Sequence, residues 1–307
     1  MIIFYSYNTN LINYAHFLSK LCDRENIVLY KYNKDKFDKA DVIVPIGIFS
    51  QIELSKYSEH KNKFLVNEPY VYYVINNKVK FYKFIKKFDI LKDSSIQLIP
   101  TFDKKYKGPN FYDKFIVKHK DGTGSFDNKI KKDHLYNLIS KYGKNYQVQE
   151  LIKVKYVHGI NCLCHNGRIV RAVNFIVEGF IDPTNNNDNC IEEVREVDPK
   201  FLDVINKITM TFQYNGFIEF EFLEDNKNNI FLIEANPRLS GHIKCIARDK
   251  SLPYVDNLII PYYDIILNNN NKQDLYVKND DVMYFGCIKN PQYKARRYGV
   301  VEFKTRE

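Results

Sequence analysis

The sequence predicts an α/β protein built from α+β lobes, and three observations support this class. Over the first seventy-odd residues, apolar runs of strand length alternate with segments of helical periodicity, which favours a small parallel sheet. Further along, strand-like segments come in pairs around turn residues such as Asn166-Gly167, which indicates antiparallel hairpins. The 307 residues are 45% apolar and 27% charged, which is ordinary for one to three folded domains and excludes wholesale disorder.

The first predicted domain covers residues 1–76 and contains three strands and two helices. The apolar runs IIFYSY, NIVLYKY and DVIVPIG are typical of strands, whereas NYAHFLSKLCDR and FSQIELSKYSE repeat apolar residues at helical spacing. We therefore expect strands at 2–7, 26–32 and 41–47, and helices at 13–24 and 49–59. A turn-rich joint, NEPY at 67–70, follows these elements.

The remaining residues, 77–307, are predicted to form a second domain that begins with an amphipathic helix near Lys78. The buried side of this helix is expected to hold Val79, Phe81, Tyr82, Ile85 and Phe88. Further elements are expected as strands at 114–118 and 146–154, helices at 131–142 and 199–212, and two hairpins, one around Asn166-Gly167 and one pairing 217–223 with 230–235.

Charge and cysteine content narrow the functional classes without choosing among them. Much of the net charge of +9 lies between residues 78 and 120, which hold twelve lysines and four aspartates; a solvated face explains such a run more often than nucleic acid does. Cys162 and Cys164 are expected to be small apolar strand residues rather than, with His165, metal ligands. No apolar stretch has the length of a membrane helix and no signal-peptide pattern is seen, so we expect a cytoplasmic protein.

The second hairpin combines buried strands with a polar ending, and its register predicts a pair of acids. If the two strands pair through an even-length connection, Glu221 lies directly opposite Glu234, in the register that also pairs Leu223 with Leu232. The other, buried face would then hold Phe220, Phe222, Phe231 and Ile233. Two ionised carboxylates this close are destabilising unless positive charge lies between them.

Asn236 and Arg238 convert this acid pair into a candidate metal site. Asn236 follows Glu234 by two residues, so it points to the same face and adds a neutral oxygen. Carboxylate and amide oxygens, completed by water and phosphate, suit Mg²⁺, and Arg238 can reach an anion bound there. A bare pair of glutamates more commonly forms an exposed acidic edge, but the added Asn, Pro and Arg favour the metal site. Glu219 shares this face as a third ligand or, as we expect, a surface residue.

The stretch FIVKHKDGTGS predicts a phosphate contact. Lys118 ends an apolar strand, and the loop that follows contains two glycines and two hydroxyl side chains. Glycines let backbone N–H groups approach a phosphate closely, and lysine supplies a compact positive charge. The same loop would equally make a plain turn, and it is not the Walker pattern, so its value depends on the features around it.

Taken in order, these features resemble the ATP-grasp superfamily, particularly the branch that contains biotin carboxylase and the carbamoyl phosphate synthetase large chain. The shared order is a small α/β domain, a helix opening in N-K-V, a strand–lysine–glycine loop, a Q-E-L-I strand and the hairpin G-F-I-E-F-E-F…F-L-I-E-A-N-P-R. The resemblance covers roughly residues 1–250. It implies an ATP-grasp domain with a nucleotide lobe at about 101–152 and a metal and substrate lobe at about 153–307.

The resemblance also implies a role for each residue that matches a family motif. Nucleotide binding would involve Lys78, Lys118, Gly122, Thr123, Gly124, Ser125, Gln149, Glu150 and Ile152. The Mg²⁺ ligands would be Glu221, Glu234 and Asn236, and the catalytic cations would be Arg238 and Lys118. The chain departs from the pattern where Asn77 replaces an acid, and where the segment after the hinge offers His158 and Asn161 instead of a ribose-binding carboxylate.

The implied activity is an ATP-dependent carboxylate–amine ligase that works through an acyl phosphate with Mg²⁺, or Mn²⁺ in its place. Its substrates would be a small-molecule carboxylic acid and an amine, such as an amino acid or a small peptide, and a homodimer is one option for its assembly. A carboxylase or carbamoyl-phosphate-type enzyme on the same fold is the first alternative. A catalytically silent nucleotide-binding regulatory module is the second, and nucleic-acid or membrane binding is not expected.

Overall fold

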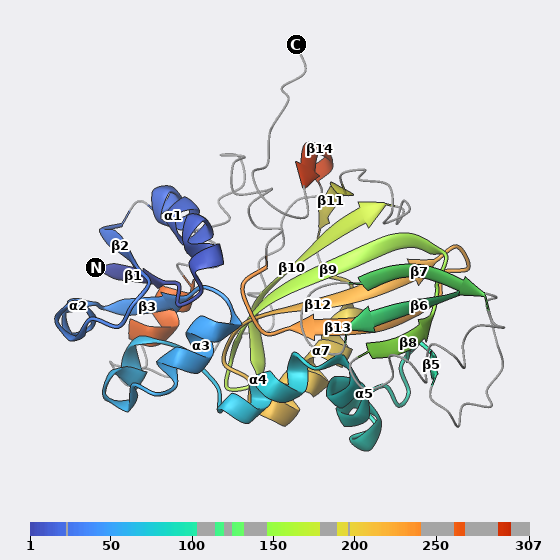
Figure 1. Cartoon of the computed structure of the whole chain (residues 1–307), viewed down its shortest axis with the longest axis horizontal. Helices are drawn as coiled ribbons and strands as arrows, with labels where there is room; N and C mark the ends of the chain where they lie inside the picture. Colours follow the sequence, from blue (N-terminus) through green and yellow to red (C-terminus); the bar gives the residue numbers. More distant parts are fainter. Residues whose placement is uncertain are drawn as a thin grey trace, which may run out of the picture.

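The structure, a computed structural model, describes residues 1–22, 24–102, 114–119, 125–131, 146–178, 189–195, 197–240, 261–267 and 288–295. Its helices are α1 (Ile12–Leu21), α2 (Lys34–Lys39), α3 (Ile48–Leu54), α4 (Pro69–Ile75), α5 (Lys78–Lys87) and α7 (Pro199–Phe212), with a further helix at 261–267 and the 3-10 turns η1 (Thr9–Leu11) and η2 (Ser58–Lys63). Figure 1 shows the strands arranged in an N-terminal sheet, a large central sheet and a smaller sheet beside it.

The N-terminal sheet has the parallel order β2-β1-β3, formed by β1 (Ile2–Tyr5), β2 (Asn26–Leu29) and β3 (Val42–Pro45). All three predicted strands are therefore confirmed, although each is shorter than expected. Residues 67–70 were predicted to be a joint, but only the first two lie outside a helix, because α4 begins at Pro69. Proline suits a first helical position because its fixed φ is helical and its missing N–H would have had no partner there.

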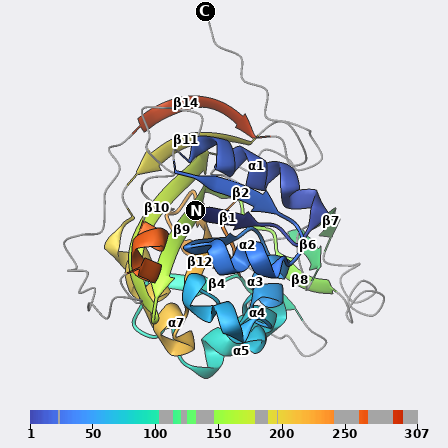
Figure 2. The same cartoon turned by 90° about the vertical axis from the view of Figure 1, so that its left-hand side faces the viewer.

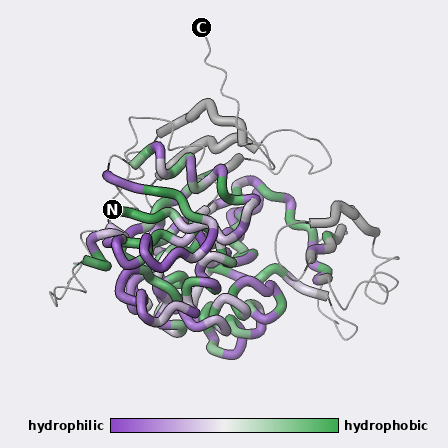
Figure 3. The backbone as a smooth tube through the Cα atoms, turned by 60° about the vertical axis from the view of Figure 1, so that its left-hand side comes forward, coloured by the Kyte–Doolittle hydropathy of each residue, from purple (hydrophilic) through white to green (hydrophobic). Residues whose placement is uncertain are grey.

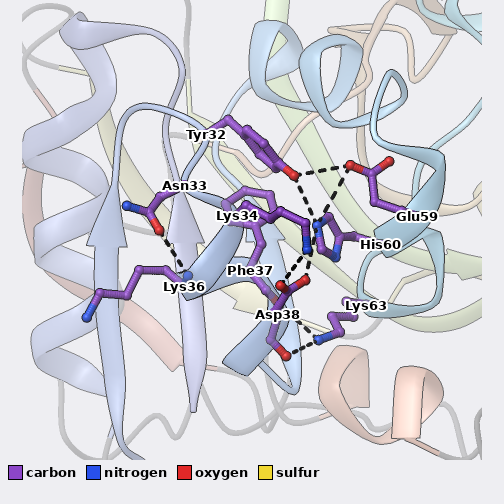
Figure 4. Close-up of polar contacts among 9 residues, drawn as sticks. All are labelled: Tyr32, Asn33, Lys34, Lys36, Phe37, Asp38, Glu59, His60 and Lys63. Carbon is purple, nitrogen blue, oxygen red and sulfur yellow. Dashed lines mark hydrogen bonds and ion pairs between the residues drawn. The ribbon is translucent and has the colours of Figure 1, made fainter.

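A polar cluster beside this sheet holds the turn η2 against α2 (Figure 4). The ammonium of Lys63 donates to the carbonyl oxygens of Phe37 at 2.9 Å and Asp38 at 2.8 Å. The hydroxyl of Tyr32 donates to Glu59 at 3.1 Å. The helix predicted at 49–59 thus ends at Leu54, and the chain continues into η2, whose last residues satisfy the carbonyl groups at the end of α2.

The central sheet has seven strands in the order β14-β11-β10-β9-β12-β13-β4. They are β4 (Ile96–Leu98), β9 (Val154–His165), β10 (Arg168–Glu178), β11 (Asn189–Arg195), β12 (Gly216–Asp225), β13 (Ile230–Asn236) and β14 (Ile288–Ala295). All pairings are antiparallel except that of β13 with β4. Strands β9 and β10 are joined by the predicted two-residue turn, in which Asn166 and Gly167 both have positive φ, 48° and 79°.

Helices α4, α5 and α7 cover one face of the central sheet, as the two views in Figures 1 and 2 agree. The cluster between them contains Phe81, Tyr82 and Ile85 of α5, as predicted, together with Cys162 and Cys164 of β9. Both cysteines are buried, so the expectation that they are apolar strand residues is confirmed. Phe88 was expected to be buried but is 48% exposed, because α5 ends at Lys87 and the helical periodicity stops there.

The other face of the central sheet packs against the N-terminal sheet in a shared core. Ile2 and Phe4 of β1 lie in one apolar cluster with Phe175 of β10 and Phe217 of β12. The tube that starts at the N-terminus in Figure 3 is accordingly coloured as hydrophobic. The fold thus places α1 and α3 next to the segment Pro237–Ser240 that follows β13, where Tyr14 and Gln51 bond to its carbonyl oxygens.

The smaller sheet has the order β5-β8-β6-β7, formed by β5 (Thr101–Phe102), β6 (Lys114–His119), β7 (Ser125–Lys131) and β8 (Tyr146–Glu150). Its strands span residues 101–150, close to the nucleotide lobe predicted at 101–152. The predicted helix at 199–212 is α7. Of the helix predicted at 131–142, Lys131 is instead the last residue of β7, and the rest lies outside the described residues. None of the described helices combines the length and the apolarity that crossing a lipid bilayer would require.

Candidate active site

The β12–β13 hairpin places two carboxylates opposite each other, as its sequence predicts. Glu221 pairs with Glu234, and Glu219 pairs with Asn236. The register shifts between Glu221 and Phe222, so Leu223 faces Phe231 and the predicted pairing of Leu223 with Leu232 is wrong. A β-bulge therefore separates the polar end of the hairpin, where the predicted register holds, from its turn end, where it does not.

The bulge also changes which face the apolar residues of β13 occupy. Phe231 and Ile233 pack with Leu223, Ile99 and Ile152, on the face that carries Glu221, rather than on the opposite face as expected. Because one extra residue is inserted, Ile233 and Glu234 follow each other on nearly the same side of the strand. The bulge thus sets an apolar floor directly beside the acid pair.

The side chains of this hairpin end form a tight polar cluster. The amide nitrogen of Asn236 donates to Glu221 Oε1 at 3.1 Å and to Glu234 Oε1 at 3.3 Å. The other oxygen of Glu234 accepts from Lys78 Nζ at 2.7 Å. Lys78 comes from the first turn of α5 and is only 7% exposed, so the structure brings four of the predicted site residues together.

Glu234 is ionised in this arrangement. Burial opposes the charged form, but the positive charges of Lys78 and Lys118 and the hydrogen bonds from Lys78 and Asn236 outweigh it and lower the pKa of Glu234. The electrostatic influence of Lys118 also places that lysine near the cluster. Lys118 lies in β6 opposite Gln147 of β8, so the smaller sheet presents its lysine toward the acids of the central sheet.

The donor set suits a hard divalent cation that also binds phosphate. Within the described residues, no group of three or more His, Cys, Asp and Glu side chains could hold a metal. The cluster instead offers the carboxylates of Glu221 and Glu234 and the side-chain amide oxygen of Asn236. Mg²⁺ is commonly bound by one or two carboxylates, with water and substrate phosphates completing the octahedron, so these residues fit that ion.

Asn77, where the family pattern has an acid, is the N-cap of α5. Its side-chain oxygen accepts from the backbone N–H of Lys80 at 3.0 Å. Asparagine and aspartate are about equally good at this position, so the replacement leaves the local geometry of Lys78 intact. Asparagine in place of the family's acid at position 77 therefore leaves the start of α5 unchanged.

The predicted hinge strand is β8, and its residues are buried. Gln149 and Glu150 are each 1% exposed. Gln149 Nε2 donates to the hydroxyl of Tyr82 at 3.1 Å, and that hydroxyl donates to the carbonyl oxygen of Leu232 at 2.9 Å. Burial raises the pKa of Tyr82 well above its ordinary value, so the phenol keeps the proton that it donates. Ile152 lies in the apolar floor described above.

Three residues of the predicted phosphate loop, Gly122, Thr123 and Gly124, lie outside the described residues. Ser125 is the first residue of β7, opposite Lys118. His158 and Asn161 occupy opposite faces of β9. His158 is hydrogen-bonded to Glu224 at 3.0 Å and contacts Phe201 of α7, away from the acids, whereas Asn161 pairs with Glu219 on their face.

Arg238 and Glu219 form an ion pair that the sequence reasoning missed. Arg238 Nη1 lies 3.2 Å from Glu219 Oε2. Glu219 is 1% exposed, so the expectation of a surface residue is wrong. The sequence places Glu219 on the same face of the strand as Glu221. It does not show that Arg238, four residues after Glu234, contacts Glu219, because that depends on how the chain turns at Pro237.

Comparison with solved structures supports the same architecture at low sequence identity. N5-carboxyaminoimidazole synthase from Aspergillus clavatus, in complex with ADP and its ribonucleotide, matches with a TM-score of 0.56 and 12% identity over 86% of this chain and 76% of that one. The biotin carboxylase domain of Hydrogenobacter thermophilus 2-oxoglutarate carboxylase, with MgADP and bicarbonate, gives 0.56 and 13% over 93% and 73%. D-alanine–D-alanine ligase from Bacillus anthracis, with ATP, gives 0.54 and 13% over 88% and 98%.

No protein-family model matches the sequence, and no curated protein is similar to it in sequence. The relationship therefore rests on the arrangement of the elements. A small parallel N-terminal sheet, a four-stranded sheet with its lysine and a large, mainly antiparallel sheet whose β12–β13 hairpin ends in E-x-N-P-R occur here in the order expected from the sequence. The chain has the ATP-grasp fold.

Proposed function

We propose that this protein is an ATP-dependent ligase that joins a carboxylic acid to an amine, with Mg²⁺ as its metal. The observation that carries the proposal is the convergence of Glu221, Glu234 and Asn236 with Lys78 at one end of the β12–β13 hairpin. Oxygen ligands for a cation and a lysine for phosphate, at the junction of two sheets, are the components that phosphoryl transfer from a nucleotide requires.

In the proposed reaction, a carboxylate oxygen of the acid attacks the γ-phosphorus of ATP, and the bond to the bridging oxygen breaks to release ADP. The acyl phosphate then has phosphate as its leaving group, whereas the free acid would have to expel oxide. The amine attacks the acyl carbon, the carbon–oxygen bond to phosphate breaks, and the nitrogen loses a proton. The products are the amide, ADP and phosphate.

The residues of the site would act by holding charge in place rather than by covalent chemistry. Lys78 and Lys118 would neutralise phosphate oxygens, and Arg238 would bind the transferring phosphoryl group or the acid's carboxylate. Glu221, Glu234 and Asn236 would hold Mg²⁺, which when bound shields the charge of the phosphates. Gln149, on the buried hinge strand, would contribute to the adenine pocket.

Two of the solved structures that this chain matches are named as amino-acid ligases. They are D-alanine–D-alanine ligase, of which the chain covers 98%, and L-amino acid ligase from Bacillus licheniformis, of which it covers 74%. Amino acids or small peptides are therefore the substrate class that we propose to test first.

The β9 residues that pair with Glu219 and Glu221 of β12 are Asn161 and Gly159. Neither of these two β9 residues has a carboxylate that could bind the ribose hydroxyls, so we expect modest rather than tight nucleotide affinity.

The test begins with calorimetric titration of Mg·ATP into the wild type and into Glu234→Gln. We expect Mg²⁺-dependent binding that is weakened at least tenfold by the substitution. Glu224→Gln is the matched control, because Glu224 lies in the same hairpin, on β12, but bonds to His158 on the opposite face. Absence of binding to the wild type would refute the proposal.

A phosphate-release screen over amino acids and amines would then identify the reaction. Release that needs both an acid and an amine supports the ligase. Release stimulated by bicarbonate alone would replace it by the carboxylase alternative, and nucleotide binding without any stimulated release would favour the regulatory module.

A further inference from the structure

We propose that Glu219 is a positioning residue that fixes the guanidinium of Arg238 for catalysis and does not bind metal. The inference deepens the proposed function, since the role of Arg238 rests on it. Glu219 lies two residues before Glu221 on the same face of β12, so the sequence alone would allow it as a third metal ligand. The contacts of its two oxygens assign it otherwise.

Both carboxylate oxygens of Glu219 are engaged by donors. Oε2 pairs with Arg238 Nη1 at 3.2 Å, and Oε1 accepts from the hydroxyl of Ser240. Glu219 and Ser240 are buried, at 1% and 0% exposed, whereas the side chain of Arg238 is 27% exposed. A buried carboxylate with two donors thus anchors an arginine whose side chain still reaches solvent.

The neighbouring acids each keep one oxygen against the amide of Asn236. Oε1 of Glu221 and Oε1 of Glu234 accept from that amide, a group that can instead present its own oxygen to a cation, while Oε2 of Glu234 accepts from Lys78. At Glu219 both oxygens accept from other donors, Arg238 and Ser240. A metal at Glu219 would have to displace one of these two contacts.

The segment from Pro237 to Ser240 is also tied to the N-terminal part of the chain. Tyr14 of α1 donates through its hydroxyl to the carbonyl oxygen of Ser240 at 2.6 Å. Gln51 of α3 donates to the carbonyl oxygen of Pro237 at 2.5 Å. Both bonds are buried. Arg238 is therefore held by its side chain through Glu219, and the backbone on either side of it, at Pro237 and Ser240, is held by α3 and α1.

Such preorganisation matters for an arginine that stabilises charge developing in a transition state. A donor already aimed at that charge needs no reorganisation during the reaction, and a displacement of about 1 Å can cost on the order of 100-fold in rate. Removing the charge of Glu219 would leave Arg238 present but free to rotate. The loss should appear in kcat more than in the affinity for nucleotide.

The kinetic experiment is a double-substitution cycle with phosphate release as the readout. Glu219→Gln should lower kcat on the order of 100-fold in the wild-type background and less than about 2-fold in an Arg238→Ala background, because it acts through Arg238. Glu219→Asp should recover part of the rate. The apparent Mg²⁺ requirement should be unchanged in Glu219→Gln but raised in Glu221→Gln, the matched acid on the same face. Equal losses in both backgrounds, or a raised Mg²⁺ requirement, would overturn the assignment.

A spectroscopic measurement tests the same contact without any activity. The side-chain ¹⁵N signals of Arg238 can be assigned as those missing from Arg238→Lys. We expect slow solvent exchange for them in the wild type and in Glu221→Gln, and fast exchange in Glu219→Gln. If the wild type shows no phosphate release, the proposed function fails while this measurement still decides the contact; signals unaffected by Glu219→Gln would refute it.

Discussion

Lys78 and Glu234 form a buried ion pair in the candidate site, with side chains 8% and 18% exposed. The carboxylate of Glu234 accepts from Lys78 Nζ at 2.7 Å, so each of the two charges has its opposite at short range. The pair thus shows how this site is assembled at the scale of single residues. The same holds for Arg238 and Glu219, so Lys78 and Arg238 each lie against a carboxylate of the site.

Lys78→Met is expected to destabilise the protein by about 3 kcal/mol at pH 7, because it leaves Glu234 as a buried carboxylate without its closest cation. The pKa of Glu234 is lowered in the wild type, so the stabilisation is fully present above the pKa of an unfolded glutamate and is lost as the pH falls through the lowered folded pKa. In the variant the pKa should rise, and the stability difference should shrink toward low pH.

Urea unfolding of both proteins between pH 7 and pH 3 measures this difference. Lys83→Met is the control, since Lys83 is exposed on the same helix and should change stability by less than about 0.5 kcal/mol. A Lys78→Met penalty that stays constant across this pH range would contradict the assigned ion pair.

At the scale of single elements, α5 and the β12–β13 hairpin bring the site together. The helix begins at Lys78 because Asn77 caps it, and β13 ends at Asn236 because Pro237 has no N–H to continue the ladder. Tyr82 of α5 connects the two sheets, accepting from Gln149 of β8 and donating to Leu232 of β13.

The N-cap predicts a different outcome for each of two substitutions at Asn77. Asn77→Asp should leave the free energy of unfolding nearly unchanged, because aspartate is an equally good N-cap, whereas Asn77→Ala should cost about 1 kcal/mol. Thermal unfolding monitored by circular dichroism suffices to compare them. Equal stability of the two variants would show that the capping bond to Lys80 contributes nothing.

Tyr82→Phe removes a hydroxyl that both donates and accepts inside the protein. The carbonyl oxygen of Leu232 and the amide of Gln149 would each lose a buried partner, so we expect a loss of about 2 kcal/mol. Tyr73→Phe, at a tyrosine that is 64% exposed, should be close to neutral. Chemical denaturation of the two variants is the comparison, and a neutral Tyr82→Phe would argue against the buried connection.

Patterns of local sequence predicted the elements better than their exact pairing. Alternation and turn residues located β1, β3, the Asn166-Gly167 turn and α7, because these signals are local. The bulge in β13 leaves no comparable trace, since Ile233 suits either face of a strand. The faces of Phe231 and Ile233 were therefore predicted wrongly, although Glu221 and Glu234 were correctly paired. Glu219 was misjudged because its partner Arg238 lies beyond a proline turn whose path is set by contacts with α1 and α3.

At the scale of the whole molecule, the N-terminal sheet and the central sheet share one core. The cluster that contains Phe4 and Val44 also contains Phe175, Phe217 and, from the helix at 261–267, Tyr262. The backbone N–H of Leu65 donates to the hydroxyl of Tyr262 at 2.8 Å, which adds a buried bond between distant parts of the chain. A domain boundary near residue 76, as the sequence suggests, would thus mark a change of sheet rather than a gap in packing.

This shared core predicts that the two sheets unfold as one cooperative unit. Phe4→Ala should lower the free energy of unfolding by roughly 3–5 kcal/mol, because Phe4 is fully buried and leaves a cavity between the sheets. Hydrogen exchange measured by mass spectrometry should then accelerate in β9 and β12 by the same factor as in β1, since slow exchange in each would require global opening. Phe49→Ala, at a side chain that is 57% exposed, is the control and should accelerate exchange in neither sheet.

Acceleration confined to β1–β3 would mean that the N-terminal sheet opens independently. In that case the bonds from Tyr14 to Ser240 and from Gln51 to Pro237 would break without unfolding the hairpin, and the two residues that flank the Arg238–Leu239 pair would lose their anchors whenever that sheet opened.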